Sequence, residues 1–233
     1  MNQNKFIEEL KNIGIEINNN QLKQLEKYYE LLVEYNKVMN LTGITEIKDV
    51  YLKHFYDSLT VFKIINLNEY STLCDIGTGA GFPGIVLKIV FPNLNVTLVD
   101  SLNKRINFLN IVIKELGLKD ITTYHCRVEE YATLNREKFD IVTSRAVATT
   151  NILLEYSIPM IKVGGYFVAM KGNIENEPNC TNALKILNSK LINKLEFKLP
   201  IEKSNRTLLL FKKYSETNRK YPRRNIEIKK KAL

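Results

Sequence analysis

A glycine-rich stretch, residues 73–84, constrains the fold of this chain more than any other segment. An apolar run leads to Asp75, and glycines follow at four positions, Gly77, Gly79, Gly81 and Gly84. Apolar residues at helical spacing come directly after them. Strand, glycine-rich turn and helix in this order are typical of a nucleotide-binding βα unit, because glycine lets backbone amides approach a ligand closely. The stretch therefore predicts a bound nucleotide rather than a plain turn.

Two overlapping motifs in this stretch indicate two different cofactors. Residues 79–84 fit the GxGxxG pattern of dinucleotide-binding domains. Residues 75–81 resemble the DxGxGxG loop of class I S-adenosylmethionine (SAM) methyltransferases. Asp100 follows Gly79 by about 20 residues, the separation at which a carboxylate accepts the ribose hydroxyls of either cofactor. The glycine-rich stretch alone therefore leaves both cofactors open.

Strand and helix patterns alternate along the chain, and this alternation predicts an α/β fold. Residues 3–65 show the apolar spacing of amphipathic helices. From residue 72 onward we expect strands at 72–75, 95–100, 121–125, 139–144, 166–170, 194–199 and 206–212. Helices are expected between them, for example over 103–116 and 181–190. Such spacing predicts a Rossmann-like, doubly wound, mostly parallel sheet with helices on both faces.

Candidate site residues follow from the position of ligands in such sheets, which bind beyond the carboxyl ends of the strands. Besides the glycine-rich loop, the rule selects Asp100 and Ser101, Val128 and Glu129, Arg145, and Lys171. Glu129 is placed to neighbour an adenine amino group, and the alternative of an exposed glutamate at a helix start stays open. His54 lies among apolar residues. We interpret it as a hydrogen-bonded, partly buried histidine that holds helices to the core rather than as a ligand.

The positive charge of the chain is concentrated at its C-terminal end. Residues 212–233 hold nine Lys and Arg against two Glu, which accounts for most of the net charge of +9. A basic arm on a near-neutral body favours contact with a polyanion. We expect this arm to clamp nucleic-acid phosphates without reading bases, so that truncation after Phe211 leaves cofactor affinity unchanged. The alternatives are a solvated tail without a partner and an arm that folds back onto the sheet.

Several classes of protein are disfavoured by composition. Three widely spaced cysteines and two histidines offer neither a disulfide framework nor a metal site. No run of about 18 apolar residues and no basic leader before an apolar run are present, so we expect a cytoplasmic protein without a membrane partner. We also expect a monomer. A dinucleotide enzyme needs a second nucleotide-binding half or a catalytic domain, and only three short strands follow the fourth, which favours SAM.

Seven segments carry a more specific resemblance, and they occur in one order along nearly the whole chain: residues 40–42, 54–59, 75–84, 100–105, 127–129, 144–146 and 221–224. With them the sequence resembles bacterial 16S ribosomal RNA guanine-N7 methyltransferases of the RsmG (GidB) family. The resemblance implies a class I SAM-dependent methyltransferase fold behind an N-terminal helical extension. It also implies SAM contacts at Gly77, Phe82, Val128, Glu129 and Arg145. After Arg224 the sequence departs from the glycine-proline pattern of the family, so no family role is carried over to the last nine residues.

The organisation expected from pattern and resemblance together has three parts. Residues 1–66 form the helical extension packed on the core, 67–212 the SAM-binding domain and 213–233 the basic arm. The expected cofactor contacts are Gly77, Gly79, Gly81, Phe82, Asp100, Ser101, Val128, Glu129 and Arg145. The expected RNA contacts are Arg145, Lys171, Arg223 and Arg224. Arg145 is expected to touch both cofactor and substrate, with a structural arginine–carboxylate pair as its alternative.

The chemistry implied by the resemblance is methyl transfer from SAM to N7 of a guanine in 16S rRNA or in the small-subunit particle. Guanine N7 is a free lone-pair acceptor, so no proton has to leave first, and we name no catalytic acid or base. Alignment of the reacting atoms can contribute roughly 7–11 kcal/mol in favourable cases. The base must be single-stranded, flipped or in a loop. Two alternatives remain, a non-catalytic basic RNA- or ribosome-binding protein and an NAD(P)-dependent oxidoreductase.

Overall fold

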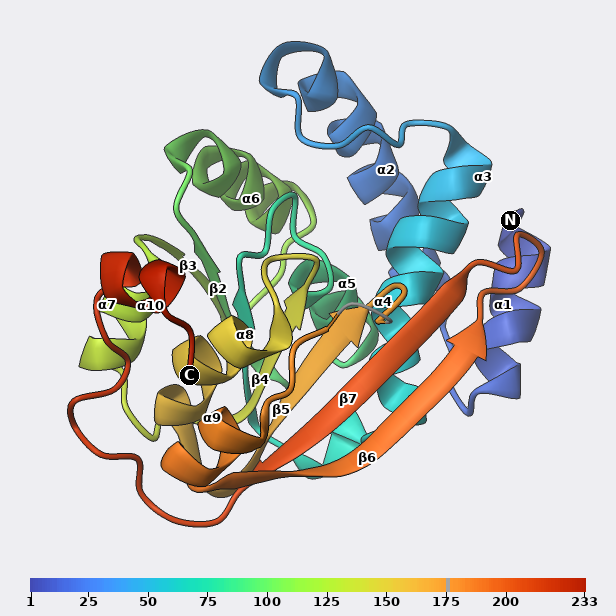
Figure 1. The fold of residues 1–233 in the computed structure, drawn as a ribbon. Coiled ribbons are helices and arrows are strands. Elements are labelled where there is room, and N and C mark those ends of the chain that lie inside the picture. The colour runs from blue at the N-terminus through green and yellow to red at the C-terminus, as the bar shows by residue number, and fades with distance from the viewer. Residues whose placement is uncertain (175–176) are drawn as a thin grey trace.

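A computed structural model describes residues 1–174 and 177–233 of the chain (Figure 1). The N-terminal part is helical, as expected. Its elements are α1 (Gln3–Asn12), α2 (Asn19–Met39), α3 (Ile47–Asp49), the π-helix η1 (Val50–Tyr56), α4 (Asp57–Leu59) and the 3₁₀ helices η2 (Thr60–Lys63) and η3 (Leu67–Glu69). Helix α2 begins with a capping box between Asn18 and Gln21, which satisfies backbone N–H groups at its first turn.

The remainder alternates strands and helices. The strands are β1 (Thr72–Ile76), β2 (Asn95–Asp100), β3 (Ile121–His125), β4 (Phe139–Arg145), β5 (Ile161–Lys171), β6 (Ser189–Lys198) and β7 (Asn205–Lys213). The helices are α5 (Gly84–Val90), α6 (Asn103–Glu115), α7 (Val128–Leu134), α8 (Thr150–Ser157), the 3₁₀ helix η4 (Ile158–Met160), α9 (Thr181–Ile186) and α10 (Asn225–Lys230). The predicted helix over 181–190 is too long, because Asn188 turns the chain in a left-handed conformation and β6 begins at Ser189.

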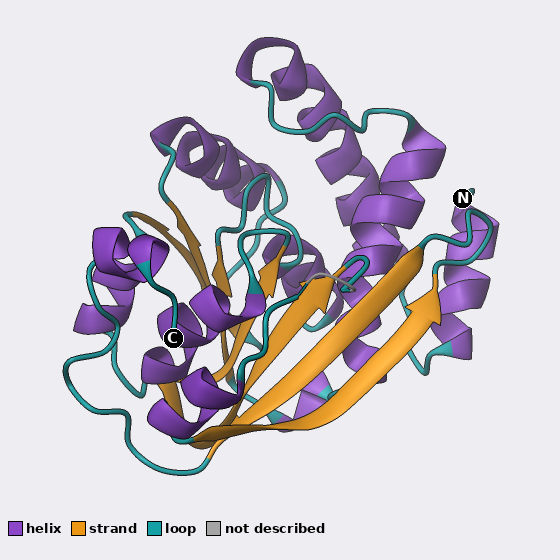
Figure 2. Cartoon of the chain, viewed as in Figure 1, coloured by secondary structure: helices purple, strands orange, loops and turns teal. Residues whose placement is uncertain are grey.

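All seven strands form one sheet in the order β3-β2-β1-β4-β5-β7-β6, with helices on both faces (Figure 2). Strand β7 runs antiparallel to both of its neighbours, and the other pairings are parallel. The prediction of a mostly parallel, Rossmann-like sheet is therefore confirmed. The strand order reverses between β1 and β4, and such a switch point is where open α/β sheets bind ligands.

The N-terminal helices cover one face of the sheet and share a single hydrophobic core with it. Leu25, Tyr28 and Leu32 of α2 are buried in that core beside residues of α5, α6 and the strands. The Gln21 side chain donates to two carbonyls at the end of α5 and so ties the two helices together. The extension therefore forms part of the main core.

A second hydrophobic core lies between the sheet and α7, α8 and α9. Tyr221 and Ile228 from the C-terminal residues are buried within it. We name residues 214–233 the C-terminal strap, because Figure 1 shows this segment running from the end of β7 round to the α7 and α8 side. Of the three alternatives for the basic arm, the structure matches the one in which it folds back. Lys213 is buried at the end of β7, where its ammonium donates to Glu137 and to two backbone carbonyls.

Candidate cofactor site

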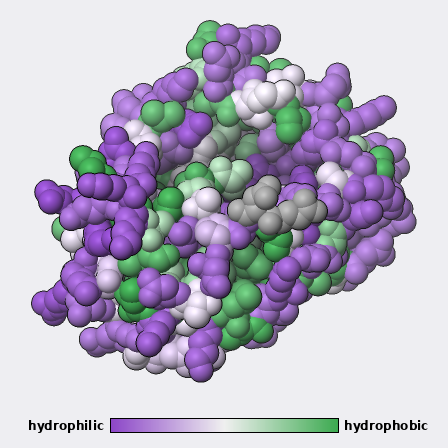
Figure 3. All heavy atoms as spheres, in the orientation of Figure 1, coloured by the Kyte–Doolittle hydropathy of each residue, from purple (hydrophilic) through white to green (hydrophobic). Residues whose placement is uncertain are grey.

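A cavity of about 490 Å³ opens at the carboxyl ends of the central strands, within the usual range for small-molecule sites. The face seen in Figure 3 carries hydrophilic side chains around its rim and more hydrophobic ones toward its centre. Of the nine cofactor contacts expected from the sequence, these line the cavity: Gly77, Gly79, Phe82, Asp100, Ser101, Val128, Glu129 and Arg145.

Gly81 is not among the residues that line the cavity. A Cβ atom there would lie 2.6 Å from the Tyr28 hydroxyl oxygen and 2.8 Å from Ile85. The same hydroxyl donates a hydrogen bond to the Ala80 carbonyl. Gly81 is thus required because α2 packs directly on the loop, a long-range constraint that the motif does not reveal.

Gly79 faces open space, in contrast to Gly81. Its φ of +61° is left-handed, and a Cβ atom there would meet nothing within 4 Å. The loop before it is tied to the neighbouring strand, because the Gly77 and Thr78 amides both donate to the Val99 carbonyl. A side chain at position 79 would therefore project from a fixed loop into the cavity.

Asp75 braces the loop from below. Its carboxylate is fully buried and accepts hydrogen bonds from the Gly84 amide at 2.8 Å and the Thr78 hydroxyl at 2.6 Å. Burial raises the pKa of Asp75 to about 7, although these two hydrogen bonds and the charge of Arg145 oppose the shift. The second carboxylate oxygen has no partner within the described structure. Asp75 therefore shapes the loop and lies beneath the cavity lining.

Asp100 stands at the end of β2 with much of its hydrogen-bonding capacity already in use. Its carboxylate accepts from the Gly79 amide at 2.9 Å, the Leu102 amide at 2.9 Å and the Arg105 guanidinium at 3.2 Å. A carboxylate offers about four acceptor positions, so about one is free. A ligand that engages Asp100 with two ribose hydroxyls must displace a donor, and the partly exposed Arg105 side chain is the one that can move.

Glu129 lies in the first turn of α7 and is only 8% exposed. Its carboxylate lines the cavity, and no hydrogen bond or ion pair to it occurs among the described residues. A buried carboxylate without a protein partner is costly, and a ligand donor would relieve that cost. Together with open space at Gly79 and the remaining acceptor position of Asp100, this feature fits a ligand that contains a nucleoside.

Arg145 joins the cavity to the N-terminal helices. Its guanidinium donates to the Lys53 carbonyl at 2.9 Å, to Asp57 at 3.3 Å and to Nδ1 of His54 at 3.3 Å. It also lies 5.2 Å from the Phe82 ring centroid, within cation–π range. The arginine–carboxylate pair weighed as an alternative is therefore present, and the same side chain still lines the cavity.

His54 is buried and hydrogen-bonded on both ring nitrogens, as the sequence interpretation expects, and it also lines the cavity. Because Nδ1 accepts from Arg145, Nε2 carries the proton and donates to the Thr42 hydroxyl at 2.9 Å. Burial and the charge of Arg145 lower the pKa of His54 to about 3. The ring stacks on Phe82 with centroids 4.3 Å apart. His54 is therefore a neutral positioning residue, set in a π-helix of the kind often found at functional sites.

A second cavity, of about 320 Å³, adjoins the first and shares His54, Arg145 and Ala146 with it. Lys171 lies on its wall, where its ammonium donates to Glu177 and to the Ala148 carbonyl. Arg206 also lines it and pairs with Asp57 at 2.9 Å. Sequence reasoning missed Arg206, because only the antiparallel return of β7 brings this residue to the carboxyl end of the sheet.

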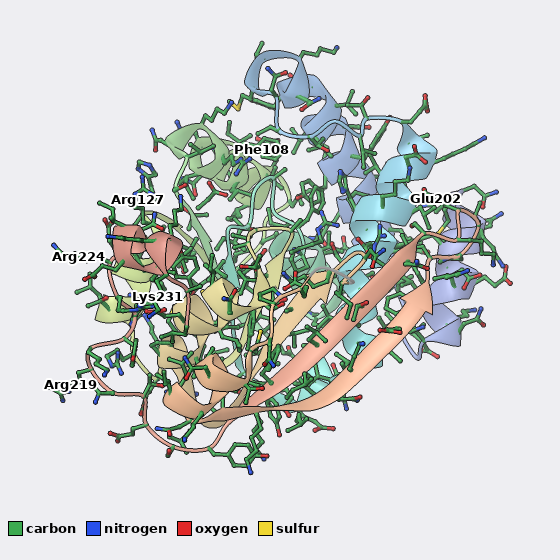
Figure 4. All side chains as sticks on the ribbon, in the orientation of Figure 1. Phe108, Arg127, Glu202, Arg219, Arg224 and Lys231 are labelled. Carbon is green, nitrogen blue, oxygen red and sulfur yellow. The ribbon has the colours of Figure 1, made fainter. Side chains whose placement is uncertain are left out.

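The two arginines expected to contact RNA differ in their surroundings. Arg223 is held by the buried Glu155, which accepts from its backbone amide and from two guanidinium nitrogens at 2.6–2.9 Å. The Arg224 side chain is 89% exposed. Figure 4 shows Arg224 and Arg219 on the side of the molecule where the strap runs. Arg223 therefore anchors the strap, whereas Arg224 makes only an exposed ion pair with Glu227, at 3.6 Å, and stays accessible to a partner.

Other cavity residues were absent from the sequence prediction. They are Leu41, Thr42, Arg105, Arg127, Ile152, Tyr156, Asn225 and Lys229, besides neighbours of the predicted residues. Leu41, Thr42, Arg105 and Arg127 stand in the quoted motifs, which was the available signal. Asn225 and Lys229 belong to α10, beyond the motifs, and no sequence signal indicated them.

Metal and membrane sites receive no support from the part of the chain that the structure describes. It contains no group of three His, Cys, Asp or Glu placed to hold a metal ion. None of its helices is both long and apolar enough to span a membrane.

The sheet order and the flanking helices are those of the class I SAM-dependent methyltransferase fold. Solved structures with the same fold include a SAM-dependent methyltransferase from Aquifex aeolicus, with a TM-score of 0.51, 18% identity and coverage of 71% of this chain and 93% of that one. Another is TYW2 from M. jannaschii in complex with AdoMet, with a TM-score of 0.52, 16% identity and coverage of 63% and 70%.

Sequence relatives narrow the assignment to one family. The family model for rRNA small subunit methyltransferase G (GidB) matches residues 21–209. Ribosomal RNA small subunit methyltransferase G of Lysinibacillus sphaericus is 48% identical over 228 residues, which is 96% of each chain. The protein of that name from Lachnoclostridium phytofermentans is 52% identical, over 94% of this chain and 92% of its own. The chain belongs to the rRNA small subunit methyltransferase G family.

Proposed function

We propose that this protein transfers a methyl group from SAM to N7 of a guanine in 16S ribosomal RNA. The observation that supports the proposal is the pair of adjoining cavities, which share His54, Arg145 and Ala146, in a chain that matches its relatives over nearly their full length. One cavity has the acidic and glycine-lined walls that suit a nucleoside cofactor. The other has the size and the charged lining that suit a base and its phosphate. Family membership does not support the two alternatives, a non-catalytic binding protein and an NAD(P)-dependent oxidoreductase.

The cofactor-binding residues follow from the walls of the first cavity. Asp100 accepts a ribose hydroxyl, Glu129 accepts from the adenine amino group, and Gly79 leaves room for the ligand beside the loop. Gly77, Phe82, Ser101, Val128 and Arg145 complete the proposed contact set. We do not retain Gly81, since the space beside it is filled by Tyr28 and Ile85.

The substrate base belongs in the second cavity, next to Arg145. Asp57 lies between Arg145 and Arg206 and so presents a carboxylate flanked by guanidinium donors. A guanine edge offers N–H donors to the carboxylate and an O6 acceptor to the arginines. The buried position requires a base that has left its stack. Lys171 lines the same space, and the exposed Arg224 is left to contact RNA phosphates.

The protein has to supply positioning rather than acid–base chemistry. SAM supplies a methyl group on a positively charged sulfur, and its transfer passes that charge to the guanine. The N7 lone pair is available without loss of a proton, so the neutral, doubly hydrogen-bonded His54 has no proton to accept. The ion pairs of Arg145 and Arg206 with Asp57 fix the wall against which the base aligns, and such alignment can contribute roughly 7–11 kcal/mol.

The proposal is tested by mapping the methyl group. Labelled SAM is incubated with the protein and either free 16S rRNA or the small-subunit particle. We expect label at a guanine whose backbone becomes cleavable after reduction, because N7 methylation makes the ring cationic. Methyl on a pyrimidine, a ribose or protein would refute the proposed atom. A Gly79→Val protein prepared in parallel excludes a contaminating methyltransferase.

A further inference from the structure

The C-terminal strap is fixed to the body of the protein at several points before it reaches the cofactor cavity. Arg136 donates to the carbonyls of Thr217 and Tyr221, both at 2.5 Å. The Tyr221 side chain is buried in the second core. Arg223 then makes its three hydrogen bonds to Glu155, which is fully buried. The strap therefore enters α10 from a set of anchored residues rather than as a loose basic tail.

Helix α10 has one face toward the protein and one toward solvent. Ile228 is fully buried against α7 and α8, whereas Ile226 is 82% exposed. The Tyr156 hydroxyl of α8 donates to the Asn225 side chain at 3.0 Å. Asn225 and Lys229 are four residues apart, so they project from the same side of the helix, and both line the cofactor cavity.

The first turn of α7, which carries Val128 and Glu129, lines the same cavity as Asn225 and Lys229. Neither the Glu129 carboxylate nor the Lys229 ammonium makes an ion pair or hydrogen bond with another described residue. Two opposite charges thus line one cavity and are paired with neither each other nor the protein. An adenine edge matches such a pair, because its amino group donates to a carboxylate and its ring nitrogens accept from an ammonium.

We propose that α10 forms the outer wall of the adenine end of the cofactor cavity, with Lys229 as a cofactor contact, so that docking of α10 and binding of SAM stabilise each other. This inference rests on the proposed function, since it assumes that SAM occupies the cavity. Any ligand that contacts docked α10 favours the docked state, and by linkage an undocked helix lowers the affinity for the ligand. The strap is then part of the cofactor site, and the earlier expectation that its removal leaves SAM affinity unchanged is reversed.

Two matched pairs of substitutions in the full chain test the proposal. Ile228→Ala removes the buried anchor of α10, and Ile226→Ala makes the same change on its exposed face. Lys229→Ala removes the cavity charge, and Lys230→Ala removes a neighbouring charge that does not line the cavity. The dissociation constant for SAM is measured by calorimetry, and hydrogen exchange of residues 225–229 is followed with and without SAM.

We expect Ile228→Ala and Lys229→Ala each to weaken SAM binding about 10-fold, the scale of one lost hydrogen bond to a charged group. Both controls should stay within about 2-fold, the size of an ordinary surface effect. In the wild type, SAM should slow exchange of the α10 amides. Lys229→Ala keeps the test valid if Ile228→Ala fails to fold.

Wild-type affinity in Lys229→Ala together with unchanged exchange in α10 would overturn the inference while leaving the proposed function intact. A wild-type chain that does not bind SAM at all would instead overturn the proposed function, and the inference with it. The two failures are therefore distinguishable in one set of titrations.

Discussion

The glycine loop and the C-terminal strap face the same cavity, yet the chain fixes them in opposite ways. Each rests on a fully buried carboxylate, Asp75 under the loop and Glu155 under the strap. Asp75 accepts from Thr78 and Gly84, three and nine residues along the chain, and both donors are neutral. Glu155 accepts from the guanidinium of Arg223, 68 residues away.

This difference separates a local structure from one that depends on the whole fold. The loop carries a brace of its own in Asp75, besides its longer-range contacts with Tyr28, Val99 and Asp100. The strap has no such brace. It can take its position only after α8 has packed and placed Glu155 where Arg223 can bind it. Removing a local brace changes a loop, whereas removing Arg223 alone leaves the buried charge of Glu155 without its charge partner.

The largest effect should come from filling the cavity at the loop. A valine at position 79 would project into the space that the ligand needs. We therefore expect Gly79→Val to weaken SAM binding by more than about 100-fold, even if the backbone of the loop keeps its conformation. Gly117→Val is the matched control, because Gly117 also has a left-handed φ, of +62°, and open space beside it. Gly117 does not line the cavity.

Both glycine variants should lose a similar free energy of unfolding, about 1–2 kcal/mol, from left-handed strain. Calorimetric titration of the two proteins with SAM shows whether the side chain fills the ligand space. Thermal unfolding of the same proteins measures the cost of the left-handed strain. Equal SAM affinity in Gly79→Val and Gly117→Val would remove the loop from the cofactor site.

The next largest effect should come from the strap anchor. Arg223→Ala leaves the buried charge of Glu155 without its guanidinium and with only the backbone amide of residue 223 as a donor, so we expect a loss of about 3 kcal/mol in the free energy of unfolding. Arg224→Ala, one residue on, should change stability by less than about 0.5 kcal/mol, because its side chain is exposed. Urea unfolding of both variants checks this. Equal stability in the two would show that the strap is not anchored through Arg223.

The same pair distinguishes anchoring from RNA contact. If Arg224 contacts a phosphate, the logarithm of the RNA binding constant should fall less steeply with the logarithm of salt concentration in Arg224→Ala. The slope should be smaller by about 0.7. Affinities measured at several salt concentrations give that slope. A slope identical to that of the wild type would exclude a phosphate contact at Arg224.

A further effect should appear as a pH dependence at Asp75. Burial raises the pKa of this carboxyl from 3.8 to about 7, so between these values the native chain holds a proton that the unfolded chain has released. The stabilisation is complete below about pH 4 and is lost as pH rises to about 7. Relative to Asp75→Asn, the wild type should therefore lose up to about 1.4 kcal/mol per pH unit between pH 5 and 7.

Asp140→Asn serves as the control for this pH dependence. Although burial opposes the shift, hydrogen bonds from Lys162 and Thr72 lower the pKa of Asp140 below 3.8. Its difference from the wild type should therefore be constant over pH 5–7. A flat difference for Asp75→Asn as well would show that Asp75 is ionised throughout and that the loop brace is charged.

The predictable part of this molecule is the part held by local contacts. The βα alternation, the loop from Asp75 to Gly84 and the strand-end position of Asp100 could all be predicted, since each depends on residues near in sequence. Strand β6 was predicted too short, because pairing with β7 extends it to Ser189. Strand pairing is a tertiary effect that overrides local propensity.

The unpredicted part depends on pairs far apart in sequence. Arg206 meets Asp57 across 149 residues, and Arg136 meets Tyr221 across 85. The basic composition of the strap indicated a polyanion partner. Composition cannot show, however, which of these charges are already paired within the protein. Arg223 and Lys213 are paired in this way, whereas Arg224 makes only an exposed ion pair with Glu227 at 3.6 Å.

The most direct test is calorimetric titration of the wild-type chain with SAM, S-adenosylhomocysteine and NAD. The central claim is that the cavity between the loop and the strap is a SAM site. We expect one site per chain that binds SAM and S-adenosylhomocysteine in competition, with no heat on adding NAD. Binding of NAD in place of SAM, or no binding of either, would contradict the claim.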